Sequence, residues 1–317
     1  MAQLTAGPPP ALAATSRPRG LTQGLWRGAQ GYLWISPWLI GFLVFTAAPF
    51  FISLYLSFTD YRIVGDIRWV GLENYQQLFT EDDVFRRSLG NTFYYLVFHV
   101  PGVMLLAFSA ALLLNQDVKG RPIFRTLFYL PSVTPGVAAT ILWVWILSAN
   151  GLLNSLLLAL GVPREASPLW FASTKWSMPG LIIMSLWGIG GTMLIYLAAL
   201  QGIPKHLYEA AEVDGAGAWK RVRHVTIPMM TPAIFFTLVL GIIGSWQVFT
   251  SALVATRGGP ADSTMFVLLW LYYQAWEYFR MGYASAIAWI LFIVIMVFTL
   301  VQFSLARRWV YYEGQVR

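Results

Sequence analysis

The chain has no cysteine among its 317 residues, and its three histidines lie far apart at positions 99, 206 and 224. Without cysteine it can form neither a disulfide nor a thiolate site. The histidines do not have the spacing of metal ligands, and no nucleophile stands with the clustered carboxylates or histidines that would activate it. The sequence therefore predicts no catalytic residue and no metal site, which argues against an enzyme.

Charged residues are scarce as well. They make up 11% of the chain, against roughly 25% in a soluble protein, whereas hydrophobic residues make up 57%. Six runs without a charged side chain are each long enough for the roughly 20 residues that span a bilayer. These runs are 28–59, 88–116, 126–163, 176–204, 224–256 and 281–306. The sequence thus predicts an all-α polytopic membrane protein with six transmembrane helices.

Ionisable side chains are nearly absent from the interior of the predicted spans. An ion-coupled secondary carrier, which is the alternative function class, usually holds its coupling ion on such groups. The spans offer only His99, and a lone histidine in a helix is more often a packed, hydrogen-bonded residue than a proton relay. The chain also lacks the G-x-x-x-x-G-K loop that cradles phosphates, so it cannot itself be an ATPase.

The formal net charge of +7 has a distribution that favours membrane orientation over nucleic-acid binding. Thirteen of the 21 Lys and Arg residues fall on the side that holds both termini and the loops 117–125 and 204–228. Eight fall on the other side. Because basic loops stay in the cytoplasm, both termini are predicted to be cytoplasmic, in a bacterial-type plasma membrane.

Domain boundaries follow from the same pattern. Residues 1–30 are rich in Pro, Ala and Gly without apolar periodicity, and they are predicted to be a disordered cytoplasmic tail. Residues 31–308 form the predicted six-helix transmembrane domain, and 309–317 a cytoplasmic C-terminal tail. The apolar run 263–276 is too short to cross the membrane, and we expect it at the outer interface.

The run 126–163 is too long for one span and too short for two. We predict a helix to about Ser148 and a short surface helix within 151–161. Pro131 and Pro135 should bend the first of these helices. A membrane helix tolerates such a bend when neighbouring groups satisfy the freed carbonyls.

The longest polar segment between two apolar runs is 204–228, which reads PKHLYEAAEVDGAGAWKRVRHVTIP. Pro204 suits the first position of a helix, and Gly215 supplies a left-handed stop at its end. A second helical segment is predicted over 216–225, with Pro228 ending it. The result is a helix-turn-helix that is too polar to enter the bilayer and too short to fold alone. Such a segment needs a partner.

Within this segment E-A-A at 209–211 is followed by Gly215 and by V-T-I-P at 225–228. The pattern resembles the EAA loop of permease subunits of ABC importers, which reads E-A-A, three residues, G, nine residues, I-x-L-P, with two conservative apolar replacements here. The resemblance implies a coupling helix that docks on a cytoplasmic ATPase. Alanines let a helix approach another surface closely, and carboxylates can bind basic groups there. The implied coupling residues are Glu209, Ala210, Ala211, Asp214 and Gly215.

Other stretches extend the resemblance over nearly the whole chain after the tail. They are V-G-L-E-N-Y at 70–75, R-T-L-F-Y-L-P at 125–131, L-Q-G-I-P at 200–204 and T-R-G-G-P at 256–260. They are similar to sugar-type permeases of the maltose, glycerol-3-phosphate and multiple-sugar systems. The stretch 70–75 either caps the helix bundle or helps to receive a binding protein.

This resemblance implies the type I ABC importer permease fold and import of a sugar or related polar solute. It also implies several partners: a second, unlike permease subunit, an extracytoplasmic solute-binding protein, and two ATPase subunits. ATP and Mg would be bound by those ATPases, with no cofactor in this chain. The sequence does not identify the solute.

The candidates for a solute path lie in the fourth and fifth predicted helices. Small-xxx-small pairs there are typical of close helix packing. Aromatic rings and an amide also lie beside these pairs. Such a set can bind a sugar, because the rings contact its apolar faces and the amide binds polar groups at its rim. Both interpretations stay open. In the maltose-type relative, substrate contacts fall at matching places, although Gly191 and Val248 replace larger or polar side chains. The candidates are Trp187, Gly188, Gly191, Thr192, Gly241, Gly244, Ser245, Gln247 and Val248.

Overall fold

The computed structural model describes residues 21–117 and 119–311. The chain divides into two compact units, Met1–Ser53 and Leu54–Arg317. Most of the predicted tail 1–30 lies outside the described residues, but its last part, from Leu21 on, belongs to the first helix. The predicted C-terminal tail lies outside them beyond Tyr311.

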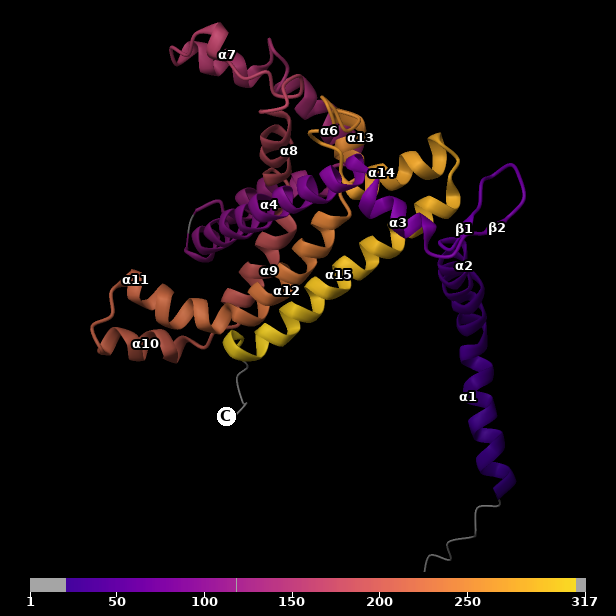
Figure 1. The fold of residues 1–317 in the computed structure, drawn as a ribbon. Coiled ribbons are helices and arrows are strands. Elements are labelled where there is room, and N and C mark those ends of the chain that lie inside the picture. Colours follow the sequence, from indigo (N-terminus) through magenta and orange to yellow (C-terminus); the bar gives the residue numbers. More distant parts are fainter. Residues whose placement is uncertain (1–20, 118, 312–317) are drawn as a thin grey trace, which may run out of the picture. The chain divides into compact units, whose positions relative to one another are not determined.

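Helices dominate the described residues (Figure 1). The α-helices are α1 Leu21–Phe42, α2 Ala48–Leu56, α3 Glu73–Thr80, α4 Asp83–Asn115, α5 Arg121–Val133, α6 Gly136–Ile146, α7 Leu152–Ala159, α8 Ser177–Leu186, α9 Gly190–Gln201, α10 Lys205–Val213, α11 Ala218–Arg221, α12 Ile227–Trp246, α13 Thr250–Ala255, α14 Val267–Tyr272 and α15 Met281–Trp309. The π-helical turns are η1 Leu43–Ala47, η3 Val222–Thr226 and η4 Tyr273–Glu277, and η2 Arg164–Ala166 is a 3₁₀ turn. Two short antiparallel strands are β1 Thr59–Asp60 and β2 Arg68–Trp69.

Four continuous helices of the described chain are long and apolar enough to cross a membrane, and two bent helix pairs bring the number to six. The continuous spans are Tyr32–Leu56, Asp83–Asn115, Ala218–Trp246 and Met281–Trp309. The bent pairs are α5 with α6, at 101°, and α8 with α9, at 44°. The all-α, six-span prediction is therefore confirmed when each bent pair counts as one span.

The sharp bend between α5 and α6 has its cause in two prolines. Pro131 lies inside α5 and has no N–H to donate, and Pro135 precedes α6. Thr134, directly before Pro135, takes an extended conformation because a proline disfavours helical geometry in its predecessor. The predicted bend is confirmed, and α7 lies within the predicted surface helix 151–161.

The unit Met1–Ser53 contributes a helix that is apolar on all sides. None of the side chains of residues 32–53 is buried within the chain. A helix that is hydrophobic all round belongs in apolar surroundings, which agrees with a membrane span.

In the unit Leu54–Arg317, α4 packs against α8, α9 and α12, and Figure 1 shows α12 between α9 and α15. Ala107, Ala110 and Ala111 are buried and lie three and four residues apart, so they share one face of α4. They join Met193 and Tyr196 of α9 in one core cluster. Small side chains on α4 let α9 approach closely. Close packing then stabilises the contact of the two helices where the hydrophobic effect of water is absent.

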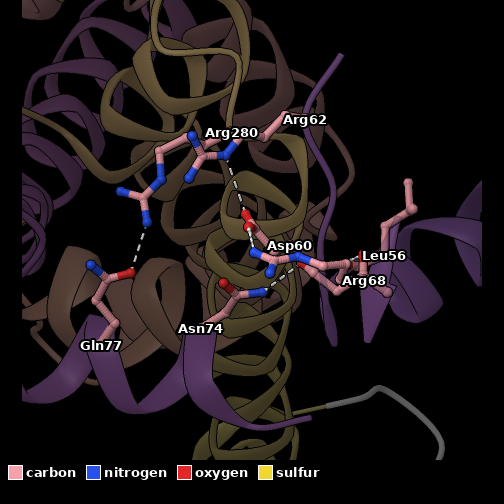
Figure 2. Close-up of polar contacts among 8 residues, drawn as sticks. Leu56, Asp60, Arg62, Arg68, Asn74, Gln77 and Arg280 are labelled. Carbon is pink, nitrogen blue, oxygen red and sulfur yellow. Dashed lines mark hydrogen bonds and ion pairs between the residues drawn. The ribbon is translucent and has the colours of Figure 1, made fainter. Parts of the chain in front are cut away.

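The segment 59–82 is fastened by polar contacts, some of which Figure 2 shows. The amide Nδ2 of Asn74 donates to the carbonyls of Ser57 at 2.9 Å and Thr59 at 3.0 Å. The hydroxyls of Tyr75 and Ser57 are 2.6 Å apart. The N-Y pair of the stretch 70–75 therefore caps the chain that leaves α2.

One carboxylate organises the strand pair β1 and β2. Asp60 accepts from Arg68 at 3.1 Å and from Arg62 at 3.3 Å (Figure 2). Partial burial raises the pKa of Asp60, but the hydrogen bonds and charges of the two guanidinium groups outweigh it, so the pKa is lowered overall. Both arginines are largely exposed, so this cluster keeps an excess of positive charge at its surface.

The short apolar segment that contains α14 is buried between other helices. Phe266, Val267 and Leu269 are fully buried, and α14 contacts α4 and α15. The hydroxyl of Thr92 on α4 accepts the N–H of Val267 at 3.2 Å, and Asn91 donates to the carbonyl of Met265 at 3.0 Å. The segment is therefore fixed to α4 by packing and by hydrogen bonds.

The first residue of α9 is a close-packing point. A Cβ at Gly190 would overlap the carbonyl oxygen of Phe128 on α5 and lie 2.6 Å from Ser132 Oγ and 2.7 Å from Tyr129 Cα. At Gly191, one residue later, a Cβ would meet no atom within 4 Å. Only the first of these glycines is therefore needed for the contact of α5 with α9.

We expect Gly190→Ala to lower the free energy of unfolding by roughly 1–3 kcal/mol, because backbone atoms must move to admit the methyl group. Gly191→Ala is the matched control, which should leave stability unchanged or slightly raised because alanine favours helix over glycine. The midpoint of thermal unfolding of the purified protein, followed by size-exclusion chromatography, compares the two. Equal midpoints would contradict the packing argument.

Candidate functional site

The first half of the segment 204–228 forms α10, whose end has a well-defined cap. Pro204 precedes the first helical residue instead of occupying it. Gly215 has φ +71°, the left-handed conformation predicted for it. Its N–H donates to the carbonyl of Glu212, and the N–H of Ala216 donates to that of Ala211, each at 2.9 Å. This pair of bonds is a Schellman motif, which ends a helix at a glycine.

The second half of the segment differs from the prediction. Pro228 does not end the helix, because α11 continues through η3 into α12 without interruption, and Pro228 lies in the first turn of α12. The N–H of Ile227 donates to the carbonyl of Val222, five residues earlier. This π-type register removes the need for the donor that proline lacks and relieves its clash with the preceding turn.

Two contacts hold α10 against α11 and η3 as a hairpin (Figure 1). The hydroxyl of Tyr208 lies 3.0 Å from that of Thr226, which is buried. Arg221 forms an ion pair with Glu212. Leu207 and Val225 pack against the core cluster of α4 and α9. The hairpin is thus attached to the base of the helix bundle and can transmit a displacement to it.

The predicted coupling residues lie mainly on the exposed surface of this hairpin. Glu209, Ala210, Asp214 and Gly215 are exposed, whereas Ala211 is half-buried. The side-chain carboxylates of Glu209 and Asp214 form no hydrogen bond or ion pair with another residue that the structure describes. Both carboxylates are therefore available to a partner.

Sequence reasoning missed one residue of this surface. Val213, the last residue of α10, is 89% exposed. It lies four residues after Glu209 and next to Asp214, so an apolar contact stands between two carboxylates. An apolar side chain inside a polar stretch is the signal that could have pointed to it.

Part of the candidate solute path lines a cavity of about 250 Å³ between α4, α8–α9 and α12. Its members from the candidate set are Gly188, Thr192 and Gly241. Sequence reasoning did not assign three polar side chains of this cavity, His99, Ser185 and Thr237. Their partners lie on different helices, so no local pattern in the sequence joins them.

His99 is held in one orientation by its neighbours. Its Nδ1 lies 2.7 Å from Ser185 Oγ, and that hydroxyl donates to the carbonyl of Ile182 at 2.6 Å. The serine oxygen therefore accepts from Nδ1–H, which leaves Nε2 of the neutral ring as a hydrogen-bond acceptor. The ring also stacks on Tyr95, with centroids 4.8 Å apart. This agrees with a packed, hydrogen-bonded histidine, as predicted.

A second cavity of about 380 Å³ contains Trp187, Gln247 and Val248 of the candidate set. Trp143 of α6 faces Trp187 edge-to-face, with ring centroids 6.1 Å apart. The indole N–H of Trp143 is buried, and no described residue accepts it. Two aromatic rings, an unused donor and an amide therefore surround one space, a combination that can hold a polar solute with apolar faces.

The two cavities are adjacent, since Ser185 and Gly188 line both. Other members of the candidate set are not brought into them. Ser245 is buried, and its hydroxyl donates to the carbonyl of Gly241 at 2.7 Å, an arrangement of helix packing. Gly191 and Gly244 line neither cavity. The described chain holds no group of three or more metal-ligating side chains.

Comparison with known families gives one match that covers most of the chain. A family described as binding-protein-dependent transport system inner membrane component matches residues 102–311. The chain is 42% identical over 288 residues to the probable ABC transporter permease protein YesP of Bacillus subtilis (strain 168), covering 90% of this chain and 93% of that one. It is 34% identical over 283 residues to the lactose transport system permease protein LacF of Rhizobium radiobacter, covering 88% and 94%.

Solved structures agree with these relatives. A chain of a bacterial ABC transporter involved in the import of the acidic polysaccharide alginate superposes with a TM-score of 0.77 at 26% identity. The match covers 91% of this chain and 98% of that one. A second structure of the alginate transporter, in complex with a pentasaccharide-bound periplasmic protein, gives the same TM-score.

Proposed function

Because the chain belongs to the family of binding-protein-dependent transport system inner membrane components, the permease subunits of ABC importers, we propose that its solute is a sugar or a related polar compound. ATP hydrolysis in this family takes place in a separate subunit. We further propose that this chain is coupled to that subunit through the hairpin of α10 and α11, and the observation that carries this is that the hairpin joins exposed carboxylates to the base of the bundle.

The surface formed by Glu209, Ala210, Val213 and Asp214 is the proposed contact with the ATPase. Its two carboxylates are exposed and without partners among the described residues, so they can take charge-assisted hydrogen bonds from basic groups. Val213 adds an apolar contact between them. Because Tyr208 binds Thr226 behind this surface, a push on α10 moves η3 and then α12.

The two adjacent cavities are the proposed solute path. Hydroxyls, an amide and the acceptor Nε2 of His99 can exchange hydrogen bonds with sugar hydroxyls, while Trp143 and Trp187 offer aromatic faces. No formal charge is needed in such a site. Ser245 contributes to helix packing and not to contact with the solute, whereas Gly191 and Gly244 line neither cavity and have no side chain to offer.

A carbohydrate as the solute class draws support from the relatives. Relatives include permease proteins of transport systems for lactose and arabinooligosaccharides, and a solved relative belongs to a transporter involved in the import of alginate. The partners that we propose are a second, unlike permease subunit, two ATPase subunits and an extracytoplasmic solute-binding protein. ATP and Mg would be held by the ATPases, and this chain would carry no cofactor.

The chain is an inner membrane component, and we propose that both termini and the loop 204–228 are cytoplasmic. The excess of basic residues on that side supports this orientation. We also propose that the chain consists of a tail at 1–30, a permease domain at 31–308 and a tail at 309–317. The first helix begins at Leu21, within the proposed first tail. The ATPase meets only the cytoplasmic side, so the following experiment tests the orientation too.

Glu209→Lys should abolish capture of the ATPase and solute-stimulated ATP turnover, because it places a cation where the partner's basic groups bind. A mismatched pair at an interface can cost several kcal/mol. Copurification and ATP turnover in reconstituted membranes measure the effect. The control is Glu165→Lys, the same reversal in the exposed turn η2. Full coupled turnover in Glu209→Lys would remove the main support for the coupling surface.

Gly215→Ala should disturb coupling through the backbone alone. Both Gly215 and Gly217 have room for a Cβ, but only Gly215 has a left-handed conformation, whereas Gly217 has φ −65°. Alanine should therefore cost roughly 1–2 kcal/mol at the first position and little at the second. We expect reduced solute-stimulated ATP turnover in Gly215→Ala only. Equal turnover in the two variants would mean that the Schellman cap does not position the carboxylates.

Gln247→Leu should lower the uptake rate or change sugar selectivity while assembly with the ATPase stays intact, because the second cavity loses its amide. Losing one hydrogen bond to an uncharged group costs roughly 0.5–1.5 kcal/mol, which is about a 2- to 12-fold change in affinity. Uptake of labelled sugars by vesicles provides the measurement. Gln116→Leu, at the exposed end of α4, is the control. Unchanged uptake across the sugars tested would favour packing over a solute path.

A further inference from the structure

A third cavity, of about 390 Å³, opens as a groove beside the coupling hairpin and outside the proposed solute path. It runs along α4 and is closed on its other sides by α9 and by the helix that continues from α11 into α12. The side chains that matter for its chemistry are Leu105, Phe108, Leu112, Tyr196, Trp219 and Val222.

The lining of this groove is nearly all apolar. The hydroxyl of Tyr196 is already bound to Thr237 Oγ1 at 2.6 Å, and its ring meets Phe108 edge-on with centroids 6.0 Å apart. Of the lining residues, only Ser109 adds another polar side chain. A sugar would lose its hydrogen bonds to water here without replacement, whereas a hydrocarbon chain would not. The groove is therefore suited to hydrocarbon.

The length and position of the groove match one leaflet of a bilayer. Met104 and Leu112 both line it and lie eight residues apart on α4, a rise of about 12 Å at 1.5 Å per residue. Half of a hydrocarbon core is about 15 Å thick. Leu112 is close to the end of α4 at Asn115, where the chain leaves the apolar region. The groove thus extends from the membrane interior to the surface that carries α10 and α11.

Positive charge gathers at the surface end of the groove. Arg223 lies four residues after Trp219, so the two side chains share a helix face. Arg223 and Lys220 are exposed, and neither forms an ion pair with any other residue of the described ranges. The neighbouring Arg221 is already paired with Glu212. Trp219 lines the groove and is 73% exposed, and tryptophan favours the membrane–water interface.

We propose that this groove binds one acyl chain of an anionic phospholipid, with the lipid phosphate at Arg223. Hydrocarbon lining, leaflet length and unpaired cations at one end together describe a phospholipid of net negative charge, since basic residues at a membrane surface attract such lipids. With the proposed orientation of the chain, this lipid belongs to the cytoplasmic leaflet. Only this choice of leaflet rests on the proposed orientation. Because Trp219 and Val222 belong to the coupling hairpin, the bound lipid braces the hairpin against α4.

Mass spectrometry of the intact transporter in detergent tests this proposal. After removal of loosely bound lipid, the wild-type complex is titrated with phosphatidylglycerol or with phosphatidylcholine of the same acyl chains. We expect the wild type to retain one more phosphatidylglycerol molecule than Arg223→Gln, whose affinity for that lipid should be roughly fivefold lower. Arg308→Gln removes another exposed cation, at the end of α15, and should keep the wild-type behaviour.

A second pair of variants tests the groove itself. Ser109→Trp places a large ring in the groove from an exposed position and should lower retention of both lipids. Leu106→Trp adds the same ring to α4 at an exposed residue outside the lining, so it should change neither. Equal retention of the two lipids by the wild type would overturn the proposal, as would equal behaviour of Arg223→Gln and Arg308→Gln. Release of the second permease subunit by Ser109→Trp, with lipid retention unchanged, would show that protein covers the groove instead.

Discussion

Backbone groups inside a bilayer have no water to bind, so every break in a membrane helix must be repaired by the protein itself. Hydroxyl groups near the two bends add hydrogen bonds to the backbone there. Thr134 Oγ1 and Ser132 Oγ donate to carbonyls of the last turn of α5, at 3.1 Å and 2.6 Å. Ser185 does the same for Ile182 near the end of α8, at 2.6 Å. Helices that would otherwise be too costly to interrupt can therefore change direction within the membrane.

The same hydroxyl groups contribute to the polar lining of the proposed solute path. Ser185 satisfies a carbonyl, orients His99 and lines both cavities. Thr134 lines the second cavity beside the bend that it stabilises. A straight, fully hydrogen-bonded helix would offer only its side chains at these positions. Bending a span brings hydroxyls and aromatic rings from several helices around one space without placing a charge in the bilayer.

The architecture and the hairpin could be predicted because their signals are local. Long uncharged runs predict membrane spans, and Gly215 near two carboxylates predicts the end of a helix. The course of the chain through Pro228 could not be predicted, because a π-type register leaves no mark in the sequence. The cavities could not be predicted completely either. In the sequence, nothing distinguishes Trp143 from any other tryptophan in an apolar run. The hydroxyl of Ser245 donates to the carbonyl of Gly241 one turn away, which the sequence does not reveal.

The absence of formal charge from the described stretches 177–201 and 227–246 has an electrical consequence. Moving one elementary charge across 100 mV involves about 2.3 kcal/mol, which is how voltage sensors work. These stretches, which line the two cavities of the proposed solute path, carry no such charge, so their rearrangement does no work against the membrane voltage. With an uncharged sugar, uptake measured at two imposed voltages and fixed ATP should then be equal. Voltage would enter only with a solute that brings its own charge.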